Sequence, residues 1–92
     1  MFIIKYTNRF KKDLRKCQKR NLDISKLLTA VKLLEQTGTL PSKYKPHRLI
    51  GNRNEQWECH LSPDWLLVWE KNESEMILLF LQTGTHSDLF DK

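Results

Sequence analysis

Hydrophobic residues recur every three or four positions in two adjacent stretches of the N-terminal half, which is the spacing of amphipathic helices. The apolar stripe of the first stretch consists of Tyr6, Phe10, Leu14 and Cys17. In the second stretch, residues 24–34, Asp23 precedes the repeat as a helix cap and Gly38 follows it as a terminator. The pattern predicts a hairpin of two helices, each of which packs one apolar face against the core.

The hydrophobic pattern is of the strand type at both ends of the chain. Residues 2–6 mix aromatic and β-branched side chains and predict a first strand, while residues 56–61, 65–70 and 76–82 predict three more, separated by polar turns. Residues 39–54 form an irregular connector, and loops of this length are often functional. The order β-α-α-β-β-β predicts an α+β fold, with a mostly antiparallel sheet and the helical hairpin on one face.

The length of 92 residues fits a single domain, residues 1–92, with one core. Sixteen Lys and Arg against eleven Asp and Glu give a formal charge of +5, which favours a polyanionic partner such as nucleic acid. No apolar run approaches the roughly 20 residues that a membrane span needs, so we expect a soluble, cytoplasmic protein. Cys17 and Cys59 lack the spacing of a disulfide framework or zinc knuckle, and we expect both thiols in the core.

Candidate chemistry gathers at the turn that follows residues 56–61. Alternation along this strand places Trp57 and Cys59 on one face and His60 on the other. If the first two lie under the helices, His60 lies on the open face, with Asp64 just beyond it at the turn. A histidine and a carboxylate are therefore expected at one edge of the sheet.

The remaining histidines lie on segments that can fold onto the same edge. His47 belongs to the connector and His86 to the tail that leaves the last strand. Convergence of His47, His60 and His86 would assemble a site, whereas three unrelated surface histidines are the alternative explanation.

Three separated motifs resemble one family. They are YKPHRLIG at residues 44–51, WECHLSPDWLLVW at residues 57–69 and TGTHSDLF at residues 83–90. The pattern resembles the YafQ branch of the RelE/ParE superfamily of bacterial type II toxins, in which a histidine precedes a glycine, a His-x-x-Pro-Asp-Trp hairpin follows and a Gly-x-His-x-x-Leu-Phe tail ends the chain. The resemblance covers nearly the whole C-terminal half, while the N-terminal helices agree only in pattern and basic character.

The resemblance implies a ribosome-dependent messenger RNA endonuclease with a microbial-RNase-like fold, the toxin of a type II toxin–antitoxin system that inhibits translation. It also implies an acidic antitoxin of the DinJ or RelB kind as partner, and a toxin that is monomeric when free. By position, the implied functional residues are His47, His60, Asp64, Trp65, His86 and Phe90. Related toxins often have an arginine where this chain has Trp57, so a phosphate-binding charge is either missing here or supplied from elsewhere, for example by Arg48 or Arg53.

The side chains themselves suit RNA cleavage without a metal or cofactor. Attack of the 2′-hydroxyl on the neighbouring phosphate needs a base, an acid and positive charge, and histidine, with an ordinary pKa of about 6.5, can fill each role. We expect His86 as general acid, His47 or Asp64 as base, and His60 as stabiliser of the phosphate.

Other candidates have a structural as well as a functional interpretation. Phe90 would stack on an RNA base or clip the tail onto the sheet, and Trp65 would contact substrate or, as is commoner at the start of a strand, pack in the core. The basic first helix would bind ribosomal RNA or form a solvated face, and its excess of positive over negative charge favours binding. Its candidate residues are Lys11, Lys12, Arg15, Lys16 and Lys19.

Two competing classes of function remain. A ParE-like topoisomerase poison would resemble this chain in fold, but that branch lacks the set of histidines and aspartate. A zinc site built from the histidines and Cys59 is disfavoured, because Cys59 alternates to the face opposite His60 and no ligand pair has the usual spacing.

Overall fold

The computed structural model describes residues 1–49 and 55–90, so Arg53 of the predicted site lies outside the described residues. Within these residues, one sheet of five strands has the order β1-β5-β4-β3-β2, with β1 parallel to β5 and the other neighbours antiparallel. The strands are β1 (Ile3–Tyr6), β2 (His47–Arg48), β3 (Gln56–Ser62), β4 (Trp65–Asn72) and β5 (Ile77–Gly84). The predicted α+β fold with a mostly antiparallel sheet is confirmed.

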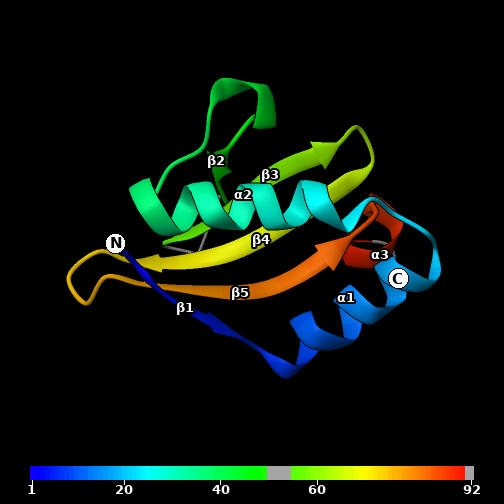
Figure 1. The fold of residues 1–92 in the computed structure, drawn as a ribbon, viewed down its shortest axis with the longest axis horizontal. Helices are drawn as coiled ribbons and strands as arrows, with labels where there is room; N and C mark the ends of the chain where they lie inside the picture. Colours follow the sequence, from blue (N-terminus) through cyan, green and yellow to red (C-terminus); the bar gives the residue numbers. More distant parts are fainter. Residues whose placement is uncertain (50–54, 91–92) are drawn as a thin grey trace.

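Helices α1 (Asn8–Lys19) and α2 (Ile24–Thr37) lie on the same side of the sheet, as the sequence predicts (Figure 1). The Thr7 side chain accepts a hydrogen bond from the backbone of Phe10 and caps α1, and Asp23 caps α2 through the backbone of Ser25. Gly38 ends α2 in the left-handed conformation, with φ of 77°. These local signals fix where each helix begins and ends.

The core lies between the helices and one face of the sheet. The helices contribute Phe10, Cys17, Leu27, Ala30 and Leu34, and the sheet contributes Cys59, Trp65, Leu67, Trp69, Leu78 and Phe80. Burial raises the pKa of the Cys59 thiol to about 12, so this cysteine stays protonated in the core. Both cysteines are free and buried, as predicted.

The opposite face of the sheet carries the candidate chemistry. Because Trp65, Leu67 and Trp69 face the helices, alternation turns Leu66 and Val68 to the other side, where both are fully buried. Leu66 pairs with His60 and Val68 pairs with Glu58 in the antiparallel register. His60 therefore lies on the face away from the helices, as expected, over an apolar floor.

The connector and the tail contain structure that the sequence pattern did not predict. The connector forms a 3₁₀ turn, η1 (Ser42–Tyr44), and the short strand β2, and the tail forms a helix, α3 (His86–Phe90). All three are too short for a hydrophobic period to reveal. Contacts of η1 and β2 with β3, and of α3 with β5 and α1, hold them in place. The predicted strands also extend by one or two residues at several ends.

Candidate active site

The turn between β3 and β4 meets the start of α3 at one end of the sheet. Nδ1 of His86 lies 2.6 Å from Oδ1 of Asp64, and the backbone N–H of His86 donates to the same oxygen at 3.0 Å. The ring centroids of His60 and His86 are 5.8 Å apart. His60, Asp64 and His86 thus form one histidine–aspartate cluster, which brings together the predicted hairpin and tail residues.

Asp64 orients the ring of His86. Hydrogen bonds from the backbone N–H and then the ring of His86 lower the pKa of the Asp64 carboxyl below its ordinary value, although the side chain is 67% exposed. An ionised carboxylate only accepts hydrogen bonds, so Nδ1 of His86 carries the hydrogen and Nε2 is left for another partner. The ring is therefore fixed in position and tautomer, as a proton-transfer group requires.

Helix α3 is held by Asp88. Its carboxylate accepts from the backbone N–H of Thr85 at 3.0 Å, and its own N–H donates to the Thr85 hydroxyl at 3.1 Å. Arg20, just after α1, donates to both carboxylate oxygens at 2.6 and 3.2 Å, and holds the pKa of Asp88 well below its usual range. A Cβ at position 84 would lie 2.8 Å from this carboxylate, so only glycine lets the Asp88 side chain approach the backbone this closely.

His47 lies on the same face as His60 but has different partners. It stands opposite Glu58 in the register of β2 and β3, and its Nε2 lies 3.1 Å from Oε1 of Glu58. Its Nδ1 lies 3.1 Å from the carbonyl oxygen of Lys45. Both ring nitrogens thus face oxygen atoms. His47 is therefore held on this face by contacts that are separate from those of the cluster.

The aromatic candidates differ in their surroundings. The Phe90 ring is 52% exposed and its centroid lies 6.5 Å from that of His86, so it is free to receive a stacked base. Trp65 is 2% exposed, and its indole N–H donates to the Thr83 hydroxyl within the core. The structure does not support substrate contact by Trp65, because its ring is covered by the helices.

Arg48 does not join the cluster, and Arg53 lies outside the described residues. Arg48 pairs with Trp57 and so shares the face that packs against the helices, opposite to His47. Trp57 stacks on Trp69, with centroids 6.5 Å apart, and Lys71 lies 5.6 Å from its ring. The departure from the family pattern at Trp57 thus belongs to the helix side of the sheet.

The basic side chains of α1 are exposed, as the binding hypothesis requires. They are Lys11, Lys12, Arg15, Lys16 and Lys19. Lys16 also lies 3.4 Å from Asp88, so part of its charge is used in holding α3. In the ranges 1–49 and 55–90, no ion pair involves the other four.

Sequence reasoning missed Glu58, Asp88 and Arg20. Glu58 shares the alternation of His60, and Asp88 follows Thr85 by three residues, which is the spacing of a capping box. Those two signals could have been found in the sequence. Arg20 could not, because 68 positions separate it from Asp88.

Two kinds of feature are absent from the part of the chain that the structure describes. Its residues contain no group of three or more His, Cys, Asp or Glu side chains that could hold a metal ion. None of its helices is long and apolar enough to cross a membrane.

Comparisons with known proteins agree with this geometry. The model of the YafQ family, bacterial toxins of type II toxin–antitoxin systems, matches residues 2–91. The chain is 38% identical over 88 residues to the mRNA interferase toxin YafQ of Escherichia coli K12, covering 95% of this chain and 94% of that protein.

Solved structures give the same relationship. A crystal structure of the E. coli DinJ–YafQ complex superposes with a TM-score of 0.88 at 35% identity, covering 98% of this chain and 99% of that one. A metal-bound toxin from Helicobacter pylori superposes with a TM-score of 0.89 at 38% identity, covering 98% and 100%. From the matched family model, the identity and the shared fold, this chain belongs to the YafQ family of toxins of bacterial type II toxin–antitoxin systems.

Proposed function

We propose that this protein is an endoribonuclease that cleaves messenger RNA on the translating ribosome and so stops translation. The observation that carries the proposal is the contact of Asp64 with His86, with the His60 ring facing it. Two imidazoles at one edge supply the acid and the base that cleavage by the 2′-hydroxyl needs. The E. coli relative is named an mRNA interferase toxin, which supports the same activity here.

The contacts suggest a role for each group. His86, oriented by Asp64 and protonated on both ring nitrogens at the start of the step, donates the Nε2 proton to the leaving 5′-oxygen and ends with its hydrogen on Nδ1, while His60 takes the proton of the attacking 2′-hydroxyl. The phosphodiester then becomes a 2′,3′-cyclic phosphate and a 5′-hydroxyl end. His47 supplies positive charge to the phosphorane, because both of its nitrogens are engaged and neither is free to accept a proton. We therefore place the base at His60 rather than at His47 or Asp64.

The surfaces around the cluster suggest how the substrate is held. The exposed ring of Phe90 would stack on a base next to the scissile phosphate, within reach of His86. The exposed lysines and arginine of α1 would bind ribosomal RNA through phosphate contacts. Ribosomes would then supply the messenger RNA in an extended form, and the toxin would act in the cytoplasm.

We also propose that an acidic antitoxin of the DinJ or RelB kind neutralises the protein. The relative solved with DinJ supports such a partner, and the formal charge of +5 suits an acidic chain. The free toxin would be a monomer.

Cleavage by purified protein tests the proposal. We expect cuts in a messenger RNA engaged on bacterial ribosomes, few cuts in the same RNA without ribosomes, and loss of both with His86→Ala. Equal cleavage by His86→Ala would contradict the assigned acid, and equal cleavage of free RNA would contradict ribosome dependence.

A further inference from the structure

Two cavities adjoin where β3, η1 and α2 meet. Their volumes are about 340 and 330 Å³, at the small end of ligand pockets, and both are lined by Lys43, His60 and Leu61. The first also reaches Lys26 and the second Lys45. Together they form a lysine groove, defined by Lys26, Lys43 and Lys45, beside the last residues of β3.

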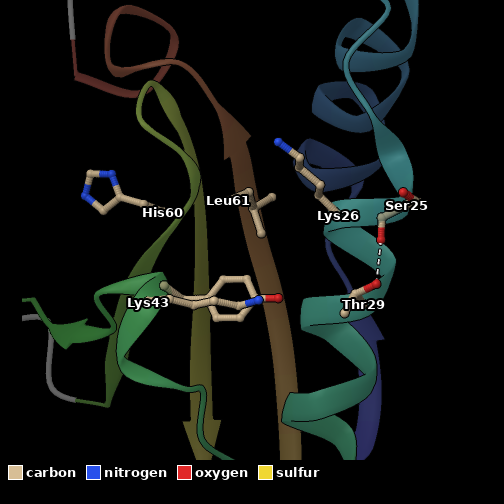
Figure 2. Close-up of a pocket in the computed structure, with 7 residues that line it drawn as sticks. Ser25, Lys26, Thr29, Lys43, His60 and Leu61 are labelled. Carbon is tan, nitrogen blue, oxygen red and sulfur yellow. Dashed lines mark hydrogen bonds between the residues drawn. The ribbon is translucent and has the colours of Figure 1, made fainter.

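Figure 2 shows how the first cavity is built. Lys26 and Thr29 extend from α2 on one side, and Lys43 reaches across from η1 on the other, with Leu61 between them. The ring of His60 points away from α2, toward the opposite side of β3. His60 therefore stands at the junction, because it lines both cavities and the centroid of its ring lies 5.8 Å from that of His86.

Positive charge predominates in the groove, although Asp23 interacts electrostatically with Lys26. All three lysines are exposed, and no ion pair reaches any of them from the residues that the structure describes. Among those same residues, no acidic side chain lines either cavity. By contrast, a cavity of about 360 Å³ at the turn between β4 and β5 is lined by Glu55, Glu70 and Glu73. The positive lining thus distinguishes the groove from that cavity, and it favours a polyanion.

The rest of the lining suits a nucleotide chain. The hydroxyl-bearing residues Ser25 and Thr29 line the α2 side, and the hydroxyl of Thr29 donates to the Ser25 carbonyl at 2.8 Å, which leaves its oxygen able to accept. Leu61 and Tyr44, only 7% and 8% exposed, complete the lining, and Lys43 Nζ lies 5.4 Å from the centre of the Tyr44 ring. Lysines that contact phosphates and hydroxyls that contact ribose occur together in binding sites for single-stranded nucleic acid.

We propose that the lysine groove binds the single-stranded RNA that flanks the scissile phosphate on one side, with successive phosphates at Lys43 and Lys26. The inference rests on the proposed nuclease function and adds a substrate subsite to it. The position of the groove favours RNA as its occupant. An RNA strand whose scissile phosphate lies between His60 and His86 has to continue past His60 or past His86, and the groove begins at His60. An acidic protein segment could bind the lysines without any connection to the cluster.

The test compares Lys26→Gln/Lys43→Gln with a matched control, Lys5→Gln/Lys32→Gln, which removes the same charge from exposed lysines on β1 and α2. Each pair is made in the His86→Ala background, and binding of a fluorescein-labelled single-stranded RNA is measured by anisotropy across salt concentrations. We expect the groove variant to lower the slope of log affinity against log salt by about 1.4, or about 0.7 for each lost contact, and the control to leave it unchanged.

An equal slope of log affinity against log salt for the two variants would overturn the inference. So would a groove variant that loses binding to an acidic antitoxin but still binds RNA normally.

The same pairs of substitutions with His86 restored give a second readout. We expect the KM for ribosome-bound messenger RNA to rise with kcat nearly unchanged in the groove variant alone, and a loss confined to kcat would contradict a binding role. Because RNA binding is measured in an inactive background, its result is separate from failure of the nuclease proposal.

Discussion

Single residues decide the geometry of the cluster. Two donors of His86, its ring and its backbone N–H, converge on one oxygen of Asp64 at 2.6 and 3.0 Å. Asp64 therefore sets both the place of the ring and the nitrogen that carries hydrogen. Glu58 acts in the same manner on His47, but from a buried position, being 7% exposed. The site thus pairs each of these histidines with its own carboxylate.

Replacing Asp64 by asparagine tests this pairing. The Asp64→Asn variant loses the charged acceptor, and we expect its kcat for RNA cleavage to fall by about 10²–10⁴-fold, the usual contribution of a positioned acid or base. The melting temperature should change little, because the Asp64 side chain is 67% exposed. The control is Glu75→Gln, which removes the same charge from another exposed carboxylate. Full activity of Asp64→Asn would show that Asp64 does not orient His86.

At the scale of elements, α3 depends on other parts of the chain. It has five residues, far fewer than the roughly 12–15 that an isolated helix needs to be even marginally stable. The link from Arg20 and Lys16 to Asp88 ties it to the end of α1. The C-terminal end of the basic helix therefore positions the tail, and on the proposed function its other exposed lysines bind RNA.

The Asp88 link predicts how stability depends on pH. Because the pKa of Asp88 is lowered in the folded protein, its contribution is complete above the ordinary carboxyl value of 3.8 and is lost as the pH falls below it. We expect Asp88→Asn to be less stable than the natural chain at pH 7, and the difference to shrink toward pH 2. Urea unfolding at both values measures it. A difference that stays constant with pH would show that the Arg20–Asp88 pair contributes nothing through charge.

At the scale of the whole molecule, the two faces of the sheet divide folding from chemistry. The helices and the apolar face form the core, and the other face carries His47, Glu58 and His60. The hairpin turn and α3 add Asp64 and His86 at one end. Since the side chains of Asp64 and His86 are 67% and 53% exposed, substrate can approach this end without a change of fold.

Much of this arrangement follows from the sequence and some of it does not. Periodicity predicted the two helices and four of the strands, and alternation placed His60 opposite Cys59 correctly. The short elements β2, η1 and α3 carry no period, so their pairing depends on contacts with distant residues. For that reason the pairing of His47 with Glu58 and that of Asp88 with Arg20 became visible only in three dimensions.

The most direct measurement of the central claim is made in cells. The protein is induced alone in a bacterial host, beside His86→Ala at equal expression, and RNA ends are mapped across the transcriptome. We predict new 5′ ends inside translated codons that are absent from the variant. Growth arrest without such ends, or the same ends with His86→Ala, would contradict the account and favour a toxin that acts by binding, such as a topoisomerase poison.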